Sequence, residues 1–142
     1  MNRKILLVGC GSEIGSMLIG MNNFSKDGFL IDTVLTKKID EKNSLKSIYA
    51  RLILSNPSLI DKVSLNFKSN SIKINGRKIK FAWGDILKFN PKLLKKKFAV
   101  TIVATSKKHI SNKTIMQKFL SVSKYVLGVA ESKVLPSMYP NL

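Results

Sequence analysis

The sequence has almost no cysteine or histidine. Cys10 is its one cysteine and His109 is its one histidine. A single cysteine excludes an intrachain disulfide and fits a reducing compartment, so we expect a cytoplasmic protein. A cysteine-rich zinc site and a histidine cluster both need more ligands than the chain has, so we predict no metal.

Long apolar runs are missing as well. No segment approaches the roughly 20 apolar residues that span a bilayer, and the N-terminus lacks the long apolar segment of a signal peptide. We therefore expect no membrane partner. The 142 residues are nevertheless 44% hydrophobic, and a chain of this length buries about two thirds of its unfolded surface on folding. We predict one domain over residues 1–142.

Acidic residues are scarce: 8 of them face 25 basic residues, which gives a net charge of +17. Such a balance is typical of proteins that bind polyanions. However, only 3 basic residues are arginine, and specific phosphate and base recognition favours the bidentate guanidinium group. The lysines are also spread along the chain, with Lys95–Lys97 as the longest run. We therefore expect no dedicated nucleic-acid partner, although the positive field would attract anionic cofactors.

A glycine-rich turn in residues 4–15 is the strongest functional motif. The apolar run Ile5–Val8 ends at Gly9, and Gly11 and Gly15 follow before an amphipathic stretch. A strand, a glycine turn and a helix in this order are typical of a dinucleotide-binding fold, because glycines let a pyrophosphate approach the backbone N–H groups at the helix start. The spacing G-x-G-x-x-x-G is one residue longer than the usual fingerprint. A strand-to-helix turn without a ligand stays the alternative interpretation.

The middle of the chain predicts an antiparallel region. Apolar and polar residues alternate over 63–67, 72–74 and 79–83, and Asn75-Gly76 is the favoured pair for a two-residue hairpin turn. The remaining segments alternate between strand and helix patterns. They comprise a strand at 29–35, a helix from Ser44 to Leu54 with Leu45, Ile48, Leu52 and Tyr49 inward, a short helix from Pro91 to Lys97, a strand at 98–104, a helix capped by Ser111 with Ile115, Met116, Phe119 and Leu120 inward, and a strand at 125–129. We predict an α/β fold, a Rossmann-like doubly wound and mostly parallel sheet, with an antiparallel insertion over about residues 63–83.

The order of these segments resembles the N-terminal, coenzyme-binding half of the glyceraldehyde-3-phosphate dehydrogenase family. Leu45–Pro57 resembles the helix before that family's "KYDS" segment, and Ile74–Ile79 matches its "V-N-G-K-x-I". Residues 83–91, followed by Phe98–Thr105, are similar to the approach to its "V-x-E-S-T-G" strand end.

The next two segments extend the resemblance. Ser111–Leu120 and Tyr125–Ser132 resemble the family's following helix and its "V-I-I-S-A-P" strand, so the match covers about residues 4–135. The resemblance implies a domain that binds NAD or NADP. It places the coenzyme on Gly9, Gly11, Ser12, Glu13, Ile14, Gly15, Thr36, Lys37, Lys38, Thr105 and Ser106.

The sequence departs from the family at the coenzyme-binding positions. The family loop "G-F-G-R-I-G" is one residue longer here, and Glu13 replaces a basic residue. The "S-T-G" segment becomes Ala104-Thr105-Ser106, and the "S-A-P" serine falls on Val129.

The end of the second strand differs most informatively. NAD-binding members carry an acidic residue there for the ribose 2′-hydroxyl, and this position falls on Lys37. A carboxylate would repel a 2′-phosphate, whereas Thr36, Lys37 and Lys38 would bind it. We therefore expect NADP in preference to NAD, with ordinary surface lysines as the alternative interpretation.

Catalytic residues of the family are not matched. Its nucleophilic cysteine follows this domain and its histidine lies in a second, substrate-binding domain. Cys10 lies in the glycine turn, and we expect His109 to be an exposed loop residue, so we predict no catalytic residue and no aldehyde oxidation by the chain alone. A missing catalytic domain or a homo-oligomer would then complete the enzyme.

Two other functions stay open. One is another Rossmann NADP-dependent reductase or a semialdehyde-dehydrogenase-like domain, although the chain has no Tyr-x-x-x-Lys motif of short-chain reductases. The other is a basic nucleotide- or nucleic-acid-binding module without redox activity.

Overall fold

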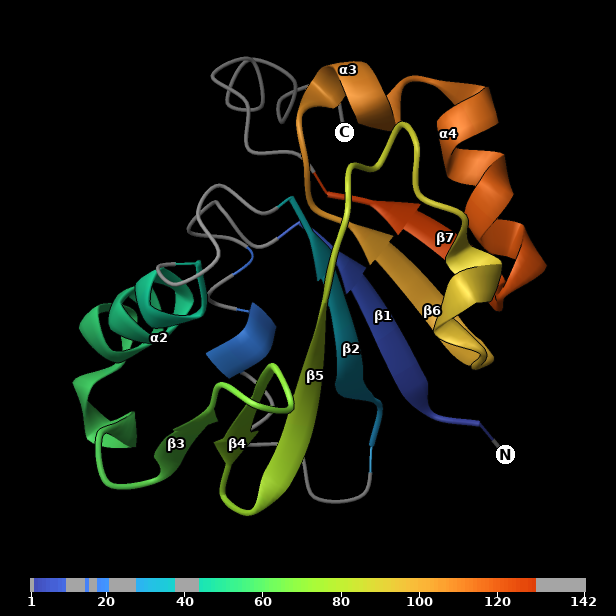
Figure 1. The fold of residues 1–142 in the computed structure, drawn as a ribbon. Helices are drawn as coiled ribbons and strands as arrows, with labels where there is room; N and C mark the ends of the chain where they lie inside the picture. The colour runs from blue at the N-terminus through green and yellow to red at the C-terminus, as the bar shows by residue number, and fades with distance from the viewer. Residues whose placement is uncertain (1, 10–14, 16–17, 21–27, 38–43, 130–142) are drawn as a thin grey trace.

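A seven-stranded sheet forms the centre of the protein. The computed structural model describes residues 2–9, 15, 18–20, 28–37 and 44–129. The strands are β1 (Lys4–Val8), β2 (Leu30–Thr36), β3 (Val63–Asn66), β4 (Ser71–Ile74), β5 (Arg77–Trp83), β6 (Phe98–Val103) and β7 (Ser123–Gly128). Their order across the sheet is β3-β4-β5-β2-β1-β6-β7 (Figure 1).

Five of these strands, from β5 across to β7, run parallel, while β3, β4 and β5 pair antiparallel. The described helices are α2 (Ser44–Ser55), α3 (Lys107–Ile110) and α4 (Lys113–Lys118), with 3-10 turns η1 (Pro57–Leu59), η2 (Pro91–Leu94) and η3 (Phe119–Ser121). Gly15 and residues 18–20 are also helical. The predicted α/β, Rossmann-like doubly wound fold is therefore confirmed. No helix in these described ranges is both long and apolar enough to cross a membrane.

Both faces of the sheet are covered, as a continuous apolar first strand requires. Leu7 in β1 belongs to one buried cluster, while its neighbours Leu6 and Val8 belong to a second cluster on the other face. The first cluster includes three of the predicted inward residues of α2, namely Leu45, Ile48 and Leu52, whereas Tyr49 is half-buried and lies outside it. The second includes Ile115 of α4 and Phe119 of η3. Figure 1 shows α2 beside β3 to β5 and α4 beside β6 and β7.

The hairpin forms at the predicted pair of residues. Asn75 and Gly76 both have positive φ, +52° and +77°, as a two-residue turn between right-twisted strands requires. The structure adds a feature that the alternating pattern did not predict: β5 pairs antiparallel with β4 on one side and parallel with β2 on the other. The strand at 79–83 is therefore a member of the parallel sheet as well as of the antiparallel region.

Two helix boundaries differ from the prediction. Asn112 caps α4, since its Oδ1 accepts a hydrogen bond from the Ile115 amide at 3.3 Å, whereas Ser111 was expected in this role. The short helix that begins at Pro91 ends at Leu94 and does not continue to Lys97. Its end is set by Lys95, which adopts the left-handed conformation at φ +54°.

The last strand also begins earlier than predicted. β7 starts at Ser123, two residues before Tyr125, and the buried Ser123 hydroxyl donates to the Phe119 carbonyl at 2.7 Å. Leu120, expected on the inward side of the preceding helix, is 52% exposed, because the chain there tightens into the 3-10 turn η3.

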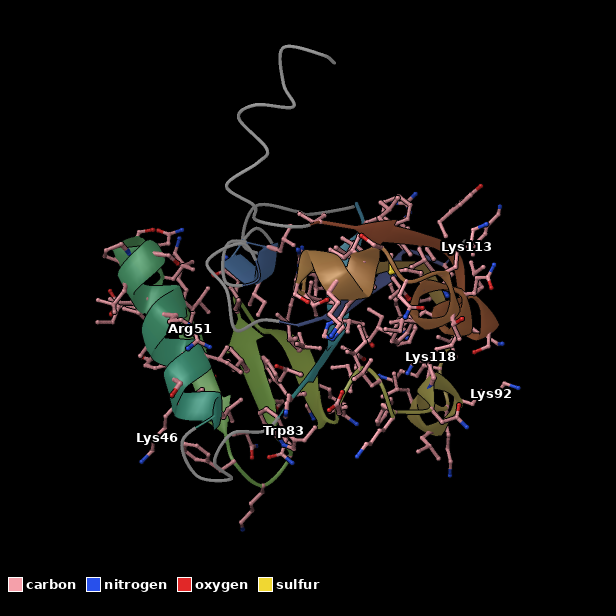
Figure 2. The ribbon with its side chains drawn as sticks, turned by 90° about the horizontal axis from the view of Figure 1, so that it is seen from above. Lys46, Arg51, Trp83, Lys92, Lys113 and Lys118 are labelled. Atoms are coloured by element: carbon pink, nitrogen blue, oxygen red, sulfur yellow. The ribbon has the colours of Figure 1, made fainter. Side chains whose placement is uncertain are left out.

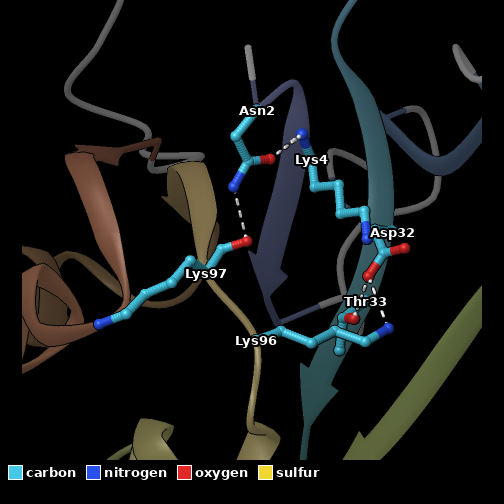
Figure 3. A network of polar contacts seen from close by, with 6 residues as sticks. All are labelled: Asn2, Lys4, Asp32, Thr33, Lys96 and Lys97. Carbon is cyan, nitrogen blue, oxygen red and sulfur yellow. Dashed lines mark hydrogen bonds and ion pairs between the residues drawn. The ribbon is translucent and has the colours of Figure 1, made fainter.

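A polar network joins the amino ends of the central strands (Figure 3). The register between β1 and β2 shifts between Ile5 and Leu6, so Asp32 has no register partner in β1. Its carboxylate Oδ2 accepts hydrogen bonds from the Thr33 hydroxyl at 2.8 Å and from Lys96 Nζ at 3.0 Å. Beside it, Asn2 Nδ2 donates to the Lys97 carbonyl at 2.8 Å. The segment before β6 is thus tied to both β1 and β2.

The network changes the ionisation of Asp32. Burial raises the pKa of this carboxyl group, but the Thr33 and Lys96 hydrogen bonds and the positive charges of Lys96 and Lys4 outweigh burial. The pKa of folded Asp32 therefore lies below its ordinary value. A lowered pKa adds stability above the unfolded pKa, and that stability is lost as the pH falls through the folded pKa.

We expect Asp32→Asn to remove this acid-sensitive contribution. At pH 7 the variant should lose at most about 1 kcal/mol, since the ion pair is partly exposed. Urea unfolding between pH 2 and pH 6 should show a steeper fall in stability on acidification for the wild type than for the variant. The control is Asp61→Asn, an exposed turn residue, which should leave the steep fall in place. Equal pH dependence of the wild type and Asp32→Asn would contradict the prediction.

Candidate functional site

The candidate site lies at the carboxyl edge of the parallel strands. The strand order reverses at β1, with β2 and β5 on one side and β6 and β7 on the other. In open α/β sheets ligands bind in the crevice at this reversal, outside the carboxyl ends of the strands. Three of the predicted site segments follow β1, β2 and β6 directly, beginning at Gly9, at Lys37 and at Thr105 after Ala104.

Gly9 is a point of close approach between strands at this edge. Its amide donates to the Leu35 carbonyl at 2.7 Å and its φ is +88°, a conformation that side chains disfavour. A Cβ atom on Gly9 would lie 2.7 Å from the Ala104 carbonyl oxygen and 2.7 Å from Thr105 Cγ2. Only glycine lets the end of β1 lie this close to the end of β6.

The chain after β6 brings a second predicted segment to Gly9. The Ala104 amide donates to the Val8 carbonyl at 2.8 Å, which places Thr105 directly beside Gly9. Thr105 Oγ1 is buried and has no hydrogen-bond partner among the described residues. Ser106 is exposed, and its carbonyl accepts the first hydrogen bonds of α3, from the His109 amide at 3.0 Å and the Ile110 amide at 3.2 Å.

The end of β2 supplies a third segment. The carbonyl of half-buried Thr36 accepts a hydrogen bond from the Gly84 amide at 3.0 Å, and Lys37 is exposed. Gly84 follows β5, and a Cβ atom there would lie 2.5 Å from the ring of Phe89 and 3.3 Å from Leu35. The ends of β2 and β5 are therefore held together at the same edge as Gly9.

Asp85 is an acidic residue of this edge that the sequence reasoning missed. Its carboxylate accepts a hydrogen bond from the Leu87 amide at 2.9 Å. This hydrogen bond lowers the pKa of Asp85, burial raises it, and electrostatic interactions with Lys37, Lys88 and His109 lower it further, so the pKa lies below its ordinary value. Gly84-Asp85 directly follows Trp83, so an acidic residue after a strand end was visible in the sequence. Because residues 63–83 were assigned to an antiparallel insertion, the end of β5 was not expected at the carboxyl edge of the parallel sheet.

His109 does not lie in an exposed loop, so that expectation is corrected. It belongs to α3 and is half-buried, and its Nδ1 is buried without a hydrogen-bond partner in the described part of the chain. Local sequence gave no helix signal here, because a four-residue helix is too short to show a period.

Several predicted site residues lie outside the described residues, as does Cys10. They are Gly11, Ser12, Glu13, Ile14 and Lys38. Gly15, at the far end of the loop, is helical and buried. Within the described ranges no three His, Cys, Asp or Glu side chains gather into a metal site.

Comparison with known proteins shows a similarity of fold. No protein-family model matches the sequence, and no curated protein matches it. Among solved structures, the chain is similar to a 6-phospho-alpha-glucosidase from gut microorganisms, determined in complex with NAD and glucose-6-phosphate, with 11% sequence identity and a TM-score of 0.51. The match covers 99% of this chain and 37% of that one, so the chain spans little more than a third of that protein's length.

We expect Gly9→Ala to destabilise the protein more than Gly76→Ala. Both glycines have positive φ, so an alanine at either position costs roughly 1–2 kcal/mol of backbone strain. A Cβ atom on Gly76 would meet no neighbour within 4 Å, whereas one on Gly9 would meet two atoms at 2.7 Å, so Gly9→Ala adds about 1–3 kcal/mol of steric strain. Urea unfolding of both variants measures the difference, and equal losses would contradict the close approach of β1 and β6.

Proposed function

We propose that residues 1–142 form one domain that binds a nicotinamide dinucleotide coenzyme at the carboxyl edge of the sheet. The observation that carries this proposal is Gly9, a positive-φ glycine at the point where the strand order reverses, whose lack of a side chain lets β1 end directly against Ala104 and Thr105. Glycine is needed at this position of dinucleotide-binding folds so that the pyrophosphate can approach the main chain.

A second observation supports a ligand at this edge. Thr105 Oγ1 is a buried hydroxyl with no hydrogen-bond partner among the described residues, and Thr105 also contacts the space that a Gly9 side chain would fill. Buried polar groups are normally hydrogen-bonded, so an unpaired hydroxyl here fits a polar ligand. The solved neighbour with this fold was determined with NAD, which agrees with the proposal.

The residues that would hold the coenzyme are those that the sequence assigned. Gly9 would admit the pyrophosphate, Thr105 and Ser106 would lie on its β6 side, and Thr36 and Lys37 would lie on its β2 side. Gly11–Gly15 and Lys38 would complete the coenzyme site. A bound nicotinamide coenzyme would supply hydride transfer, while this chain would bind and orient it.

We propose further that the domain acts as the coenzyme-binding part of a glyceraldehyde-3-phosphate dehydrogenase-like oxidoreductase. The Asn75-Gly76 turn between β4 and β5, which falls in the segment that resembles the family's "V-N-G-K-x-I", supports this proposal. The catalytic cysteine and histidine would come from another domain or subunit, since Cys10 is the one cysteine of the sequence and is far from His109 along the chain.

The charge at the end of β2 favours NADP in this proposal. Lys37 is exposed directly after β2, where an acidic residue would accept the ribose 2′-hydroxyl of NAD. An ammonium group attracts the 2′-phosphate of NADP, and Asp85 lies near enough for its pKa to respond to the Lys37 charge. Asp85 would thus compete with the phosphate for Lys37 and moderate the preference.

We expect tighter binding of NADP than of NAD, with Lys37→Glu reversing the preference. Replacing the attraction by repulsion should weaken NADP binding by about 10- to 100-fold, or roughly 1.4–2.8 kcal/mol, and should change NAD binding little. Isothermal titration calorimetry measures both affinities. The matched control is Lys73→Glu, an exposed residue of β4 with the same charge change. Wild-type NAD binding equal to or tighter than NADP binding would overturn the NADP preference.

The same titrations test coenzyme binding itself. Absence of binding heat with both coenzymes would overturn the proposed function. Steeply salt-dependent binding of a short DNA duplex without coenzyme binding would favour the basic module instead.

A further inference from the structure

The fold gathers lysines that are spread along the sequence. Two hollows adjoin η2, one of about 390 Å³ and one of about 270 Å³, and Lys92 lines both. Lys88 and Lys118 also line the larger hollow, and Lys95–Lys97 line the smaller one. We call these six lysines and their two hollows the lysine surface. In Figure 2, Lys92 and Lys118 lie on the opposite side of the molecule from Lys46 and Arg51 of α2.

Three lysines of this surface are already engaged. Lys96 pairs with Asp32 at 3.0 Å, Lys97 Nζ donates to the Ser121 carbonyl at 2.7 Å, and Lys118 Nζ donates to the Ile86 carbonyl. Of these, only Lys96 has its charge balanced by a direct ion pair in the described part of the chain. These contacts fix the rim of the two hollows.

The other three lysines have no direct ion pair with the described residues, although the charge of Lys88 acts on the Asp85 carboxylate. The ammonium groups of Lys88, Lys92 and Lys95 make no hydrogen bond or ion pair with the described residues, and all three side chains are exposed. The left-handed conformation of Lys95, whose amide donates to the Lys92 carbonyl at 3.1 Å, ends η2 between the two hollows. Uncompensated cations around adjoining hollows attract an anion that extends from one to the other.

The side chains present indicate which anion fits. Arginine, which grips a single phosphate bidentately, is absent from both linings. Phe89 is the one aromatic residue in the linings, and it packs against Gly84 and the second buried cluster rather than standing free as a base-stacking platform. Single-stranded nucleic acids are usually held by such stacking. The lysine surface therefore has the means to recognise phosphate charge and little means to recognise bases.

We infer that the lysine surface binds a linear polyphosphate anion that runs through both hollows by way of Lys92. Its smaller hollow lies before the amino end of β6, whereas the larger hollow follows β5 and comes closer to the proposed coenzyme edge. Neither lining includes a residue to which the coenzyme is assigned, so polyphosphate binding and coenzyme binding can each fail without the other.

The experiment compares two triple variants of equal charge. The first variant is Lys88→Ala/Lys92→Ala/Lys95→Ala, which removes the three lysines that have no direct ion pair with the described residues. The second variant is Lys73→Ala/Lys78→Ala/Lys80→Ala, which removes three exposed lysines from the β4–β5 hairpin. Short-chain inorganic polyphosphate and an oligothymidylate with the same number of phosphates are titrated by calorimetry at low and moderate salt. Circular dichroism and thermal unfolding show that both variants are folded.

We expect the first variant to bind polyphosphate at least about tenfold more weakly at low salt than the wild type. The slope of log affinity against log salt should shrink by about 2 if three phosphate contacts of a flexible chain are lost. The hairpin variant should stay within about twofold of the wild type. Equal losses in both variants would assign the binding to net charge and overturn the inference. Lack of polyphosphate binding, or tighter binding of the oligothymidylate, would overturn it as well.

Discussion

The approach of β1 to β6 at Gly9 is the constraint on which the rest of the carboxyl edge depends. The Gly9 amide is bonded to Leu35 of β2, and the space beside it is filled by Ala104 and Thr105 after β6. Three strand ends therefore meet within the reach of one residue. The neighbouring strands need glycine at this position for their contact, and the proposed coenzyme would need the same glycine.

The segment between β5 and β6 carries charged residues at both edges of the sheet. It begins at the carboxyl edge with Asp85, whose carboxylate lies among positive charges, and ends at the amino edge with Lys95–Lys97. At the amino edge Lys96 meets Asp32, so each edge has one carboxylate with a lowered pKa. In a chain with 8 acidic and 25 basic residues, these two carboxylates lie where several lysines converge, and there they offset repulsion that would oppose folding.

Local patterns predicted most of the fold. The apolar run of β1, the Asn75-Gly76 turn and the helical spacing of α2 each act over a few residues, so the sequence alone was enough for them. The double pairing of β5 was not predictable in this way, because alternation does not say which strand lies on the other side. Asp85 was missed for the same reason, because it lies at the candidate site only if β5 pairs with the parallel strand β2. The Thr105 hydroxyl, which has no partner within the described part of the chain, depends on packing between distant segments and has no sequence signature. Asn112 and Ser111 are both good capping residues, so only geometry could choose between them.

The register shift at Asp32 has a consequence for how β2 tolerates change in length. Side chains alternate along a strand, yet Ile31 and Val34, three positions apart, belong to the same buried cluster, because one residue between them has no counterpart in β1. Asp32 is thus the extra residue at the register shift, and side chains alternate regularly on either side of it. Removing Asp32 itself would leave Ile31 and Val34 two positions apart, on one face of a regular strand, whereas removing any other residue of β2 would exchange the faces of every residue on one side of the deletion. Length variation in relatives of this chain should therefore fall at Asp32 or in the loops around β2, and spare the rest of the strand.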